Sequence, residues 1–258
     1  MSKVFLGVGH GGKDSGAVEY IKESEVNLNM ALACRDYLVA NGVEVRMSRE
    51  KDENDDLNEE IRECNAFAPD LAVDIHNNAG GGDGCEVYHS IFVGKGKTLA
   101  ENINQELMAI GQNSRGVKTR KSSHGNYDYY GFIRNTKASA VIVESVFVDN
   151  KADAEQADTL EEQKVFGVAI AKGILKTLGI EPKNQVVSQP VQNGYRVKIV
   201  NCSVLNVRDG AGTKYDINTT VKKDEVYTIV EEKINGSTKW GKLKSGAGWI
   251  SLKYTKKI

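Results

Sequence analysis

Three short, mainly apolar segments of this chain each end on a side chain that can bind a metal or move a proton. Residues 4–8 lead through Gly9 to His10, residues 71–75 lead to His76, and residues 140–143 lead to Glu144. A short apolar run bounded by glycine or polar residues is typical of a buried strand. In open α/β sheets, ligands bind outside the carboxyl ends of the strands. We therefore expect these three side chains to share one site.

Segments with helical spacing separate the predicted strands. Helices are predicted from about residue 23 to Gly42, up to Phe67, over 97–111 and over about 153–178, and further strands over 43–47 and 85–89. Strands that alternate with helices predict an α/β fold with a mostly parallel sheet and helices on both faces. Residues 112–131 are predicted to form a long polar loop, and such long connections are often functional. Candidate substrate contacts are Tyr129 in this loop, Arg134 just after it and Asn78, which follows His76.

The composition and the hydrophobic periodicity of the sequence change after residue 180. Residues 181–194 contain Pro182 and Pro190 and lack any helical or strand period, which indicates a linker. Residues 195–258 consist of short strand-like segments divided by turns, which predicts a small all-β barrel. The 258 residues are enough for one sizeable domain and one small one. We expect a catalytic domain over 1–180, a linker over 181–194 and a β domain over 195–258.

Charge is distributed unevenly along the chain. Residues 190–258 contain 13 Lys and Arg against 6 Asp and Glu, whereas residues 1–180 contain 20 against 28. This asymmetry suggests an anionic partner for the C-terminal part, although lysines also keep small domains soluble.

No apolar run approaches the ~18 residues of a membrane span, and no signal peptide follows Met1. We expect a protein that is cytoplasmic as synthesised, without a nucleic-acid partner or membrane insertion.

The residue types at the predicted site suit zinc chemistry. A catalytic zinc takes three protein ligands from His and carboxylate side chains. His10 and His76 supply two, and Glu23 is the leading third candidate, with Glu19 and Glu25 as local alternatives. Glu144 remains as general acid/base, because an apolar approach strand favours a raised carboxyl pKa. On the residues alone, hydrogen-bonded loop histidines and a structural ion pair at Glu144 explain the pattern equally well.

Four motifs in order carry a resemblance to a known family. They are Gly9-His10-Gly11-Gly12, Glu23 through Asn27-Leu28, His76-Asn77-Asn78 and Val143-Glu144 through Asn150. With them, residues 3–179 resemble the zinc-dependent N-acetylmuramoyl-L-alanine amidases of the amidase-3 type. The resemblance implies one Zn²⁺ per chain held by His10, Glu23 and His76, with Glu144 as the catalytic glutamate. It also implies hydrolysis of the peptidoglycan amide between N-acetylmuramic acid and L-alanine.

This chain departs from the family pattern at three places, none of them a proposed ligand. Gly7-Val8 stands where the family usually has Asp-Pro, Asp74 stands where it has Ser, and Val146 stands where it often has Gly. These departures concern the groove around the site and leave the expected reaction unchanged.

The C-terminal part carries a second resemblance. Leu205–Thr213 and the segment from Trp240 to Ile250 resemble bacterial SH3-type domains. The resemblance implies a module that binds the cell wall, where its basic balance fits polymers that carry phosphate or carboxylate. Together the two parts imply a lytic enzyme like a phage endolysin. The alternatives are a zinc peptidase that cleaves another wall peptide bond and a non-catalytic wall-binding protein on the same scaffold.

Overall fold

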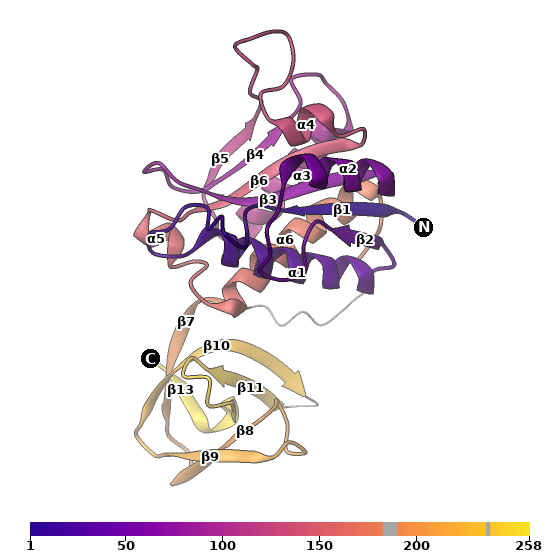
Figure 1. Cartoon of the computed structure of the whole chain (residues 1–258). Helices are drawn as coiled ribbons and strands as arrows, with labels where there is room; N and C mark the ends of the chain where they lie inside the picture. The colour runs from indigo at the N-terminus through magenta and orange to yellow at the C-terminus, as the bar shows by residue number, and fades with distance from the viewer. Residues whose placement is uncertain (183–189, 236–237) are drawn as a thin grey trace. The chain divides into compact units, whose positions relative to one another are not determined.

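The computed structural model of the chain describes residues 1–182, 190–235 and 238–258 (Figure 1). The chain forms two compact units, Met1–Asn184 and Gln185–Ile258. Each unit contains its own sheet.

The first unit is built on a six-stranded sheet. β1 pairs in parallel with β2 and β3, and β3 pairs in parallel with β6, whereas β4 runs antiparallel to β6 and parallel to β5. The predicted α/β class with a mostly parallel sheet is therefore confirmed. In sheet order the strands are β2 (Glu44–Met47), β1 (Lys3–Val8), β3 (Leu71–Asn78), β6 (Ser139–Phe147), β4 (Cys85–His89) and β5 (Ser114–Lys118).

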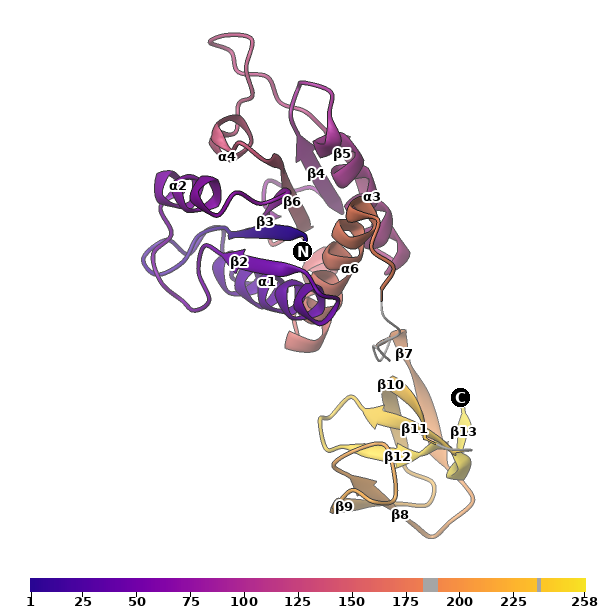
Figure 2. The ribbon, with the colours of Figure 1, turned by 90° about the vertical axis from the view of Figure 1, so that its right-hand side faces the viewer.

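Helices cover both faces of this sheet, as predicted (Figures 1 and 2). α1 (Glu23–Ala40), α3 (Lys95–Ala109) and α6 (Leu160–Leu178) pack together on one face. α2 (Leu57–Phe67) and α4 (Gly131–Asn135) cover part of the other face, where Ile61 and Phe132 join Phe5, Ala72 and Ile142 in a buried apolar cluster. The short helix α5 (Lys151–Ala154) follows β6.

The expectation that residues 112–131 form one long loop is wrong at its two ends. Residues Ser114–Lys118 form strand β5, and α4 begins at Gly131. β5 lies at the edge of the sheet, where it pairs with β4 alone. All five of its residues are exposed or half-buried. A strand that buries so little needs no apolar alternation, which is why its sequence did not reveal it.

The second unit is the all-β structure that the sequence predicts. Its core contains Val197, Ile199, Val207, Ile229 and Ile250. The seven strands form an antiparallel sheet with the order β13-β7-β10-β11-β12-β8-β9. Their bounds are β7 (Pro190–Ile199), β8 (Val204–Arg208), β9 (Ile217–Lys222), β10 (Val226–Asn235), β11 (Thr238–Leu243), β12 (Trp249–Ser251) and β13 (Thr255–Lys257).

The predicted linker, 181–194, falls partly outside the described residues, at 183–189. Strand β7 begins at Pro190, five positions before the expected start of the β domain at Tyr195. The sequence analysis also missed β13, a three-residue edge strand that follows the short helix η1 (Leu252–Tyr254). Among the described residues, no helix combines the length and the apolar character needed to cross a bilayer.

Candidate metal centre

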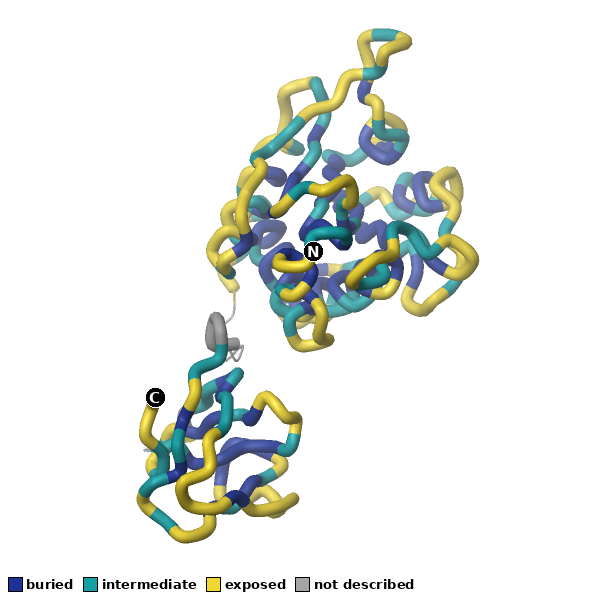
Figure 3. The backbone as a smooth tube through the Cα atoms, turned by 90° about the vertical axis from the view of Figure 1, so that its left-hand side faces the viewer, coloured by how far each residue is buried: buried dark blue, intermediate teal, exposed yellow. Residues whose placement is uncertain are grey.

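The loop after β1 brings its histidine close to two other segments because glycines leave room for them. A Cβ on Gly9 would lie 2.1 Å from Cε1 of His76, and a Cβ on Gly16 would lie 2.5 Å from Oε2 of Glu23. His10 itself has a φ of 63°, a left-handed conformation that is unusual for a residue other than glycine. Such strain clusters at functional sites. Figure 3 views this unit from the side on which β1 ends, where exposed loops lie over buried segments.

His10, Glu23 and His76 form a compact set of metal-donor atoms. Oε1 of Glu23 lies 3.2 Å from Nε2 of His10 and 3.1 Å from Nδ1 of His76, and the three donor atoms all lie within 4.8 Å of one another. Tetrahedral zinc with bonds of about 2.0–2.1 Å places its ligand atoms roughly 3.3 Å apart. This donor set therefore fits zinc. The alternative carboxylates, Glu19 and Glu25, are exposed and stand outside the set.

Each histidine has its second ring nitrogen paired with an aspartate. Nδ1 of His10 lies 2.8 Å from Oδ2 of Asp14, and Nε2 of His76 lies 3.3 Å from Oδ2 of Asp74. A metal-binding histidine commonly donates its other N–H to a carboxylate, which fixes the orientation of the ring. Sequence analysis did not select either aspartate. Asp74 did carry a signal, because it is a charged residue inside an otherwise apolar strand and two positions before His76.

Glu23 is held as a carboxylate although its side chain is buried. Its Oε2 accepts a hydrogen bond from the backbone N–H of Ala17 at 2.9 Å, and its Oε1 accepts one from the N–H of Asn77 at 3.2 Å. Burial raises the pKa of Glu23, but hydrogen bonds from His10 and His76 lower it by more, so the pKa lies well below its ordinary value. A carboxylate that stays ionised is ready to bind a cation.

The histidine pKa values respond to the same carboxylates. The hydrogen bond to Glu23 raises the pKa of His10. Burial lowers the pKa of His76, but Asp74 and Glu23 raise it by more, and the result lies well above the ordinary value. In the absence of a cation, the raised pKa values favour protonation of these rings beside the carboxylates. A metal ion must displace those protons.

Glu144 lies beside the donor set, on the neighbouring strand. It pairs with His76 in the parallel register of β3 and β6, so both side chains project from the same face of the sheet. Its Oε2 atom is buried and has no hydrogen-bond partner among the described residues. Burial raises the pKa of Glu144 to about 7. An unpaired carboxyl group with such a pKa can accept or donate a proton near neutral pH.

The conformation of the loop that carries His10 also depends on a residue that sequence analysis missed. Arg49, which is 2% exposed, donates to the backbone oxygens of Val8, Gly9 and Ser24. It thereby fixes the loop of His10 against the start of α1. One arginine in a polar segment offers no sequence signal for this role.

Comparison with known proteins places these motifs in a family. Residues 4–176 match the family model described as N-acetylmuramoyl-L-alanine amidase, of the amidase-3 type. The chain belongs to this amidase family. It is 34% identical to N-acetylmuramoyl-L-alanine amidase CwlM of Bacillus licheniformis, over 67% of this chain and 66% of that one. It is 31% identical to the endolysin of Bacillus phage SPP1, over 95% of this chain and 94% of that one.

Solved structures share the fold of the first unit. Cwp6 from Clostridium difficile superposes with a TM-score of 0.67 at 36% identity, covering 69% of this chain and 29% of Cwp6. The catalytic domain of the amidase CwlV from Bacillus (Paenibacillus) polymyxa var. colistinus superposes with a TM-score of 0.63 at 28% identity, covering 70% of this chain and all of that domain.

The three predicted substrate contacts of this amidase-family chain lie outside the donor set. Nδ2 of Asn78 donates to Oε2 of Glu86 at 3.3 Å. Arg134 donates to the backbone oxygens of Asp128 and Tyr129, so it supports the loop that carries Tyr129. A role for any of the three in substrate binding stays a prediction.

Tyr129 and Arg134 border a cavity of about 550 Å³ at the opposite end of the strands. Asp128 fixes this loop by accepting hydrogen bonds from Ser90 and Ile91, which follow the end of β4. Because β4 runs antiparallel to β6, its end lies beside the start of β6 and away from Glu144. The cavity is lined by Ser122, Ser123, His124, Tyr127, Tyr129 and Arg134.

Proposed function

We propose that this chain is a zinc-dependent peptidoglycan hydrolase that cleaves the amide between N-acetylmuramic acid and L-alanine. The observation that carries the proposal is the donor set of His10, Glu23 and His76 with the buried carboxyl group of Glu144 next to it in register. Membership of the amidase family and similarity to a phage endolysin over 95% of the chain support the choice of substrate.

The residues of the centre divide the chemistry between them. Zinc bound by His10, Glu23 and His76 would polarise the scissile carbonyl and lower the pKa of a bound water. Glu144 accepts the proton of the attacking water and returns a proton to the leaving amine. Burial raises the pKa of Glu144 to about 7 before a metal binds, which brings its ionised and protonated forms within reach of each other near neutral pH. Asp14 and Asp74 keep the two imidazole rings oriented.

We further propose that the second unit is an SH3-type module, over 195–258, that holds the enzyme on the wall. Its excess of Lys and Arg favours anionic wall polymers as partners. The proposed division is a catalytic domain over 1–180, a linker over 181–194 and this module, an arrangement suited to an endolysin. The similarity to the phage endolysin extends through this part of the chain.

The deciding experiment is mass spectrometry of purified Gram-positive peptidoglycan digested with the chain. We expect released stem peptides with free L-alanine amino termini and glycan strands that are otherwise intact. A strong chelator should abolish the release, and added Zn²⁺ should restore it. New amino termini elsewhere in the peptide would identify a zinc peptidase instead. Wall binding without any cleavage would identify a binding protein on an amidase scaffold.

A further inference from the structure

A row of ionisable side chains continues from the metal centre across the sheet to its edge. Glu86 on β4 pairs with Glu144 in the antiparallel register of β4 and β6, so the two side chains lie on the same face. Beyond Glu86, the edge strand β5 contributes Arg115 and Lys118. The row therefore runs from His76 on β3, through β6 and β4, to two cations on β5.

Glu86 is buried and forms ion pairs with two basic side chains. It is 4% exposed, and its Oε1 lies 2.5 Å from both Nε of Arg115 and Nζ of Lys118. Its Oε2 accepts a hydrogen bond from the hydroxyl of Tyr88 at 2.8 Å. One cation would suffice to neutralise Glu86 and tie β5 to β4. The second cation is balanced by another acid, because Asp83 also lies close enough to act on Arg115.

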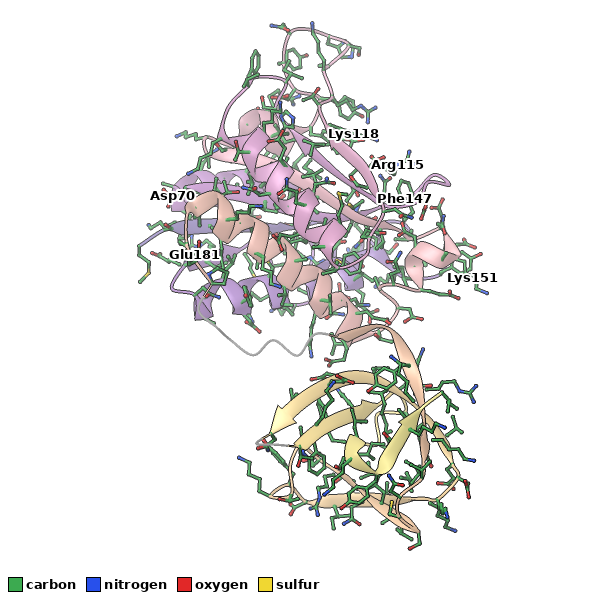
Figure 4. The ribbon with its side chains drawn as sticks, turned by 180° about the vertical axis from the view of Figure 1, so that it is seen from behind. Asp70, Arg115, Lys118, Phe147, Lys151 and Glu181 are labelled. Carbon is green, nitrogen blue, oxygen red and sulfur yellow. The ribbon has the colours of Figure 1, made fainter. Side chains whose placement is uncertain are left out.

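Arg115 is fixed in position and still accessible. Its Nε contacts Glu86, and its guanidinium group lies 5.2 Å from the centre of the Phe147 ring. Arg115, Phe147 and Lys118 lie along the same edge of the unit in Figure 4. The side chain of Arg115 is 43% exposed, and the structure gives its two terminal nitrogens no hydrogen-bond partner among the described residues. Two such nitrogens can bind a carboxylate through parallel hydrogen bonds.

We propose that Arg115, supported by Lys118, binds a carboxylate of the stem peptide on the leaving-amine side of the scissile bond. This inference rests on the proposed amidase function. Strands lie about 4.8 Å apart, which places β5 roughly 10 Å from Glu144. An extended peptide spans about 3.3–3.6 Å per residue. The Arg115 side chain extends back from β5 to Glu86 on β4, so its guanidinium group lies closer to Glu144 than β5 itself does. It can therefore reach a group about one residue beyond the scissile bond, and that group is the α-carboxylate of the D-glutamate that follows L-alanine.

The test compares two N-acetylmuramoyl tripeptides, L-Ala-γ-D-Glu-L-Lys with the α-carboxyl group of glutamate either free or amidated. For the zinc-loaded full chain we expect kcat/KM to be roughly 10- to 100-fold higher for the free carboxylate, as for a charge-assisted hydrogen-bonded pair. Arg115→Gln should remove this preference by lowering kcat/KM for the free acid only. Arg115→Lys, which keeps the charge but loses the paired donors, should retain part of it.

Lys151→Gln is the matched control, because it removes an exposed positive charge from the same unit. We expect it to leave the preference unchanged. Equal cleavage of both tripeptides by the unmodified chain would overturn the inference and leave the proposed function standing. So would a preference that survives in Arg115→Gln or disappears in Lys151→Gln. Cleavage of neither tripeptide by a chain that loads zinc and binds walls would overturn the proposed function, and the inference with it.

Discussion

At the residue scale, the two histidines of the donor set present different ring nitrogens to Glu23. His10 uses Nε2 and gives Nδ1 to Asp14, whereas His76 uses Nδ1 and gives Nε2 to Asp74. Gly7 pairs with Asp74 across β1 and β3, and a Cβ at Gly7 would lie 2.7 Å from Oδ1 of Asp74. The glycine thus leaves the space in which Asp74 reaches His76.

The aspartates should therefore control metal affinity without binding the metal. We expect Asp74→Ala to weaken zinc binding by about 10- to 100-fold, because His76 loses the partner that orients it. Competition with a chromophoric chelator measures the affinity independently of activity. Glu25→Ala is the control, since Glu25 is exposed on the same helix as Glu23. Zinc affinity that is unchanged in Asp74→Ala would show that the ring needs no such support.

Glu144→Gln should separate proton transfer from metal binding. The variant keeps the shape of the side chain and all three donors, so it should keep its zinc while losing activity by ~10²–10⁴-fold. Burial holds the pKa of Glu144 at about 7. The ionised form at neutral pH therefore costs the metal-free protein roughly 1–3 kcal/mol of folding stability.

Removing that charge should raise the melting temperature of the metal-free variant. Thermal unfolding with chelator present, metal analysis and release of amino groups from walls provide the three measurements. Hydrolysis at the normal rate would remove Glu144 from the mechanism. Loss of zinc by Glu144→Gln, combined with its retention by Glu23→Ala, would reverse the roles of these two carboxylates.

The pH dependence of hydrolysis follows from the same group. Below its pKa, Glu144 is protonated and accepts no proton from water, so kcat/KM should fall about tenfold per pH unit on the acid side. A divalent ion nearby stabilises the carboxylate and lowers the pKa from about 7. The acid midpoint should therefore lie at or below about pH 7 in the zinc-loaded protein. A midpoint well above this value would point to a different base.

At the element scale, prediction from sequence succeeded where an element buries an apolar face. β1, β3 and β6 are central strands with mostly buried residues, and their ends carry the candidate site. β5 and β13 lie at sheet edges and bury little, so their sequences resemble loops. Residue types alone made Glu23 only the leading candidate for the third ligand, and the family resemblance was needed to choose it, because the choice depends on how the start of α1 meets the loop after β1.

Helix α6 depends on glycines whose role only the packing reveals. A Cβ on Gly173 would lie 2.5 Å from Cα of Ile103 in α3, and one on Gly167 would lie 2.2 Å from the backbone oxygen of Met30 in α1. The helix can therefore approach both neighbours closely. In sequence, two glycines within a helix only suggest a weaker helix.

Gly173→Ala should accordingly destabilise the first unit, although alanine is the better helix former. The new methyl group meets backbone atoms that cannot move independently, and overpacking of this kind costs about 1–3 kcal/mol. Chemical denaturation monitored by circular dichroism measures the change. Lys172→Ala, one position earlier in α6, should stay within about 0.5 kcal/mol of the parent. A Gly173→Ala variant as stable as the parent would show that α3 and α6 can separate at little cost.

At the scale of the whole molecule, composition indicated two parts with opposite charge, and the structure contains two units with separate sheets. Of the basic residues in the second unit, several are paired with acids, including Lys198 with Asp224 and Lys239 with Glu232. Lys256 and Lys257 lie exposed on the edge strand β13. Lysines on an edge strand also discourage pairing with other sheets, so their position alone does not assign them to a ligand.

If these exposed lysines contact the wall, wall binding by the intact chain should be salt-dependent and should require them. The inactive Glu144→Gln background keeps the walls whole while binding is measured by sedimentation. Because exposed charges are screened over ~8 Å at physiological ionic strength and ~3 Å at 1 M, we expect binding to weaken roughly tenfold or more between about 0.05 and 1 M NaCl. Lys256→Glu with Lys257→Glu should weaken it at low salt, where electrostatic attraction is strongest.

The matched control reverses the same amount of charge in the first unit, with Lys137→Glu and Lys151→Glu, both exposed. If the two double variants weaken binding equally, net charge governs adsorption and β13 has no special part in it. If the β13 variant binds walls normally but self-associates, its lysines protect the sheet edge. A loss of binding specific to the β13 variant, absent at high salt, would show that this strand contacts an anionic wall polymer.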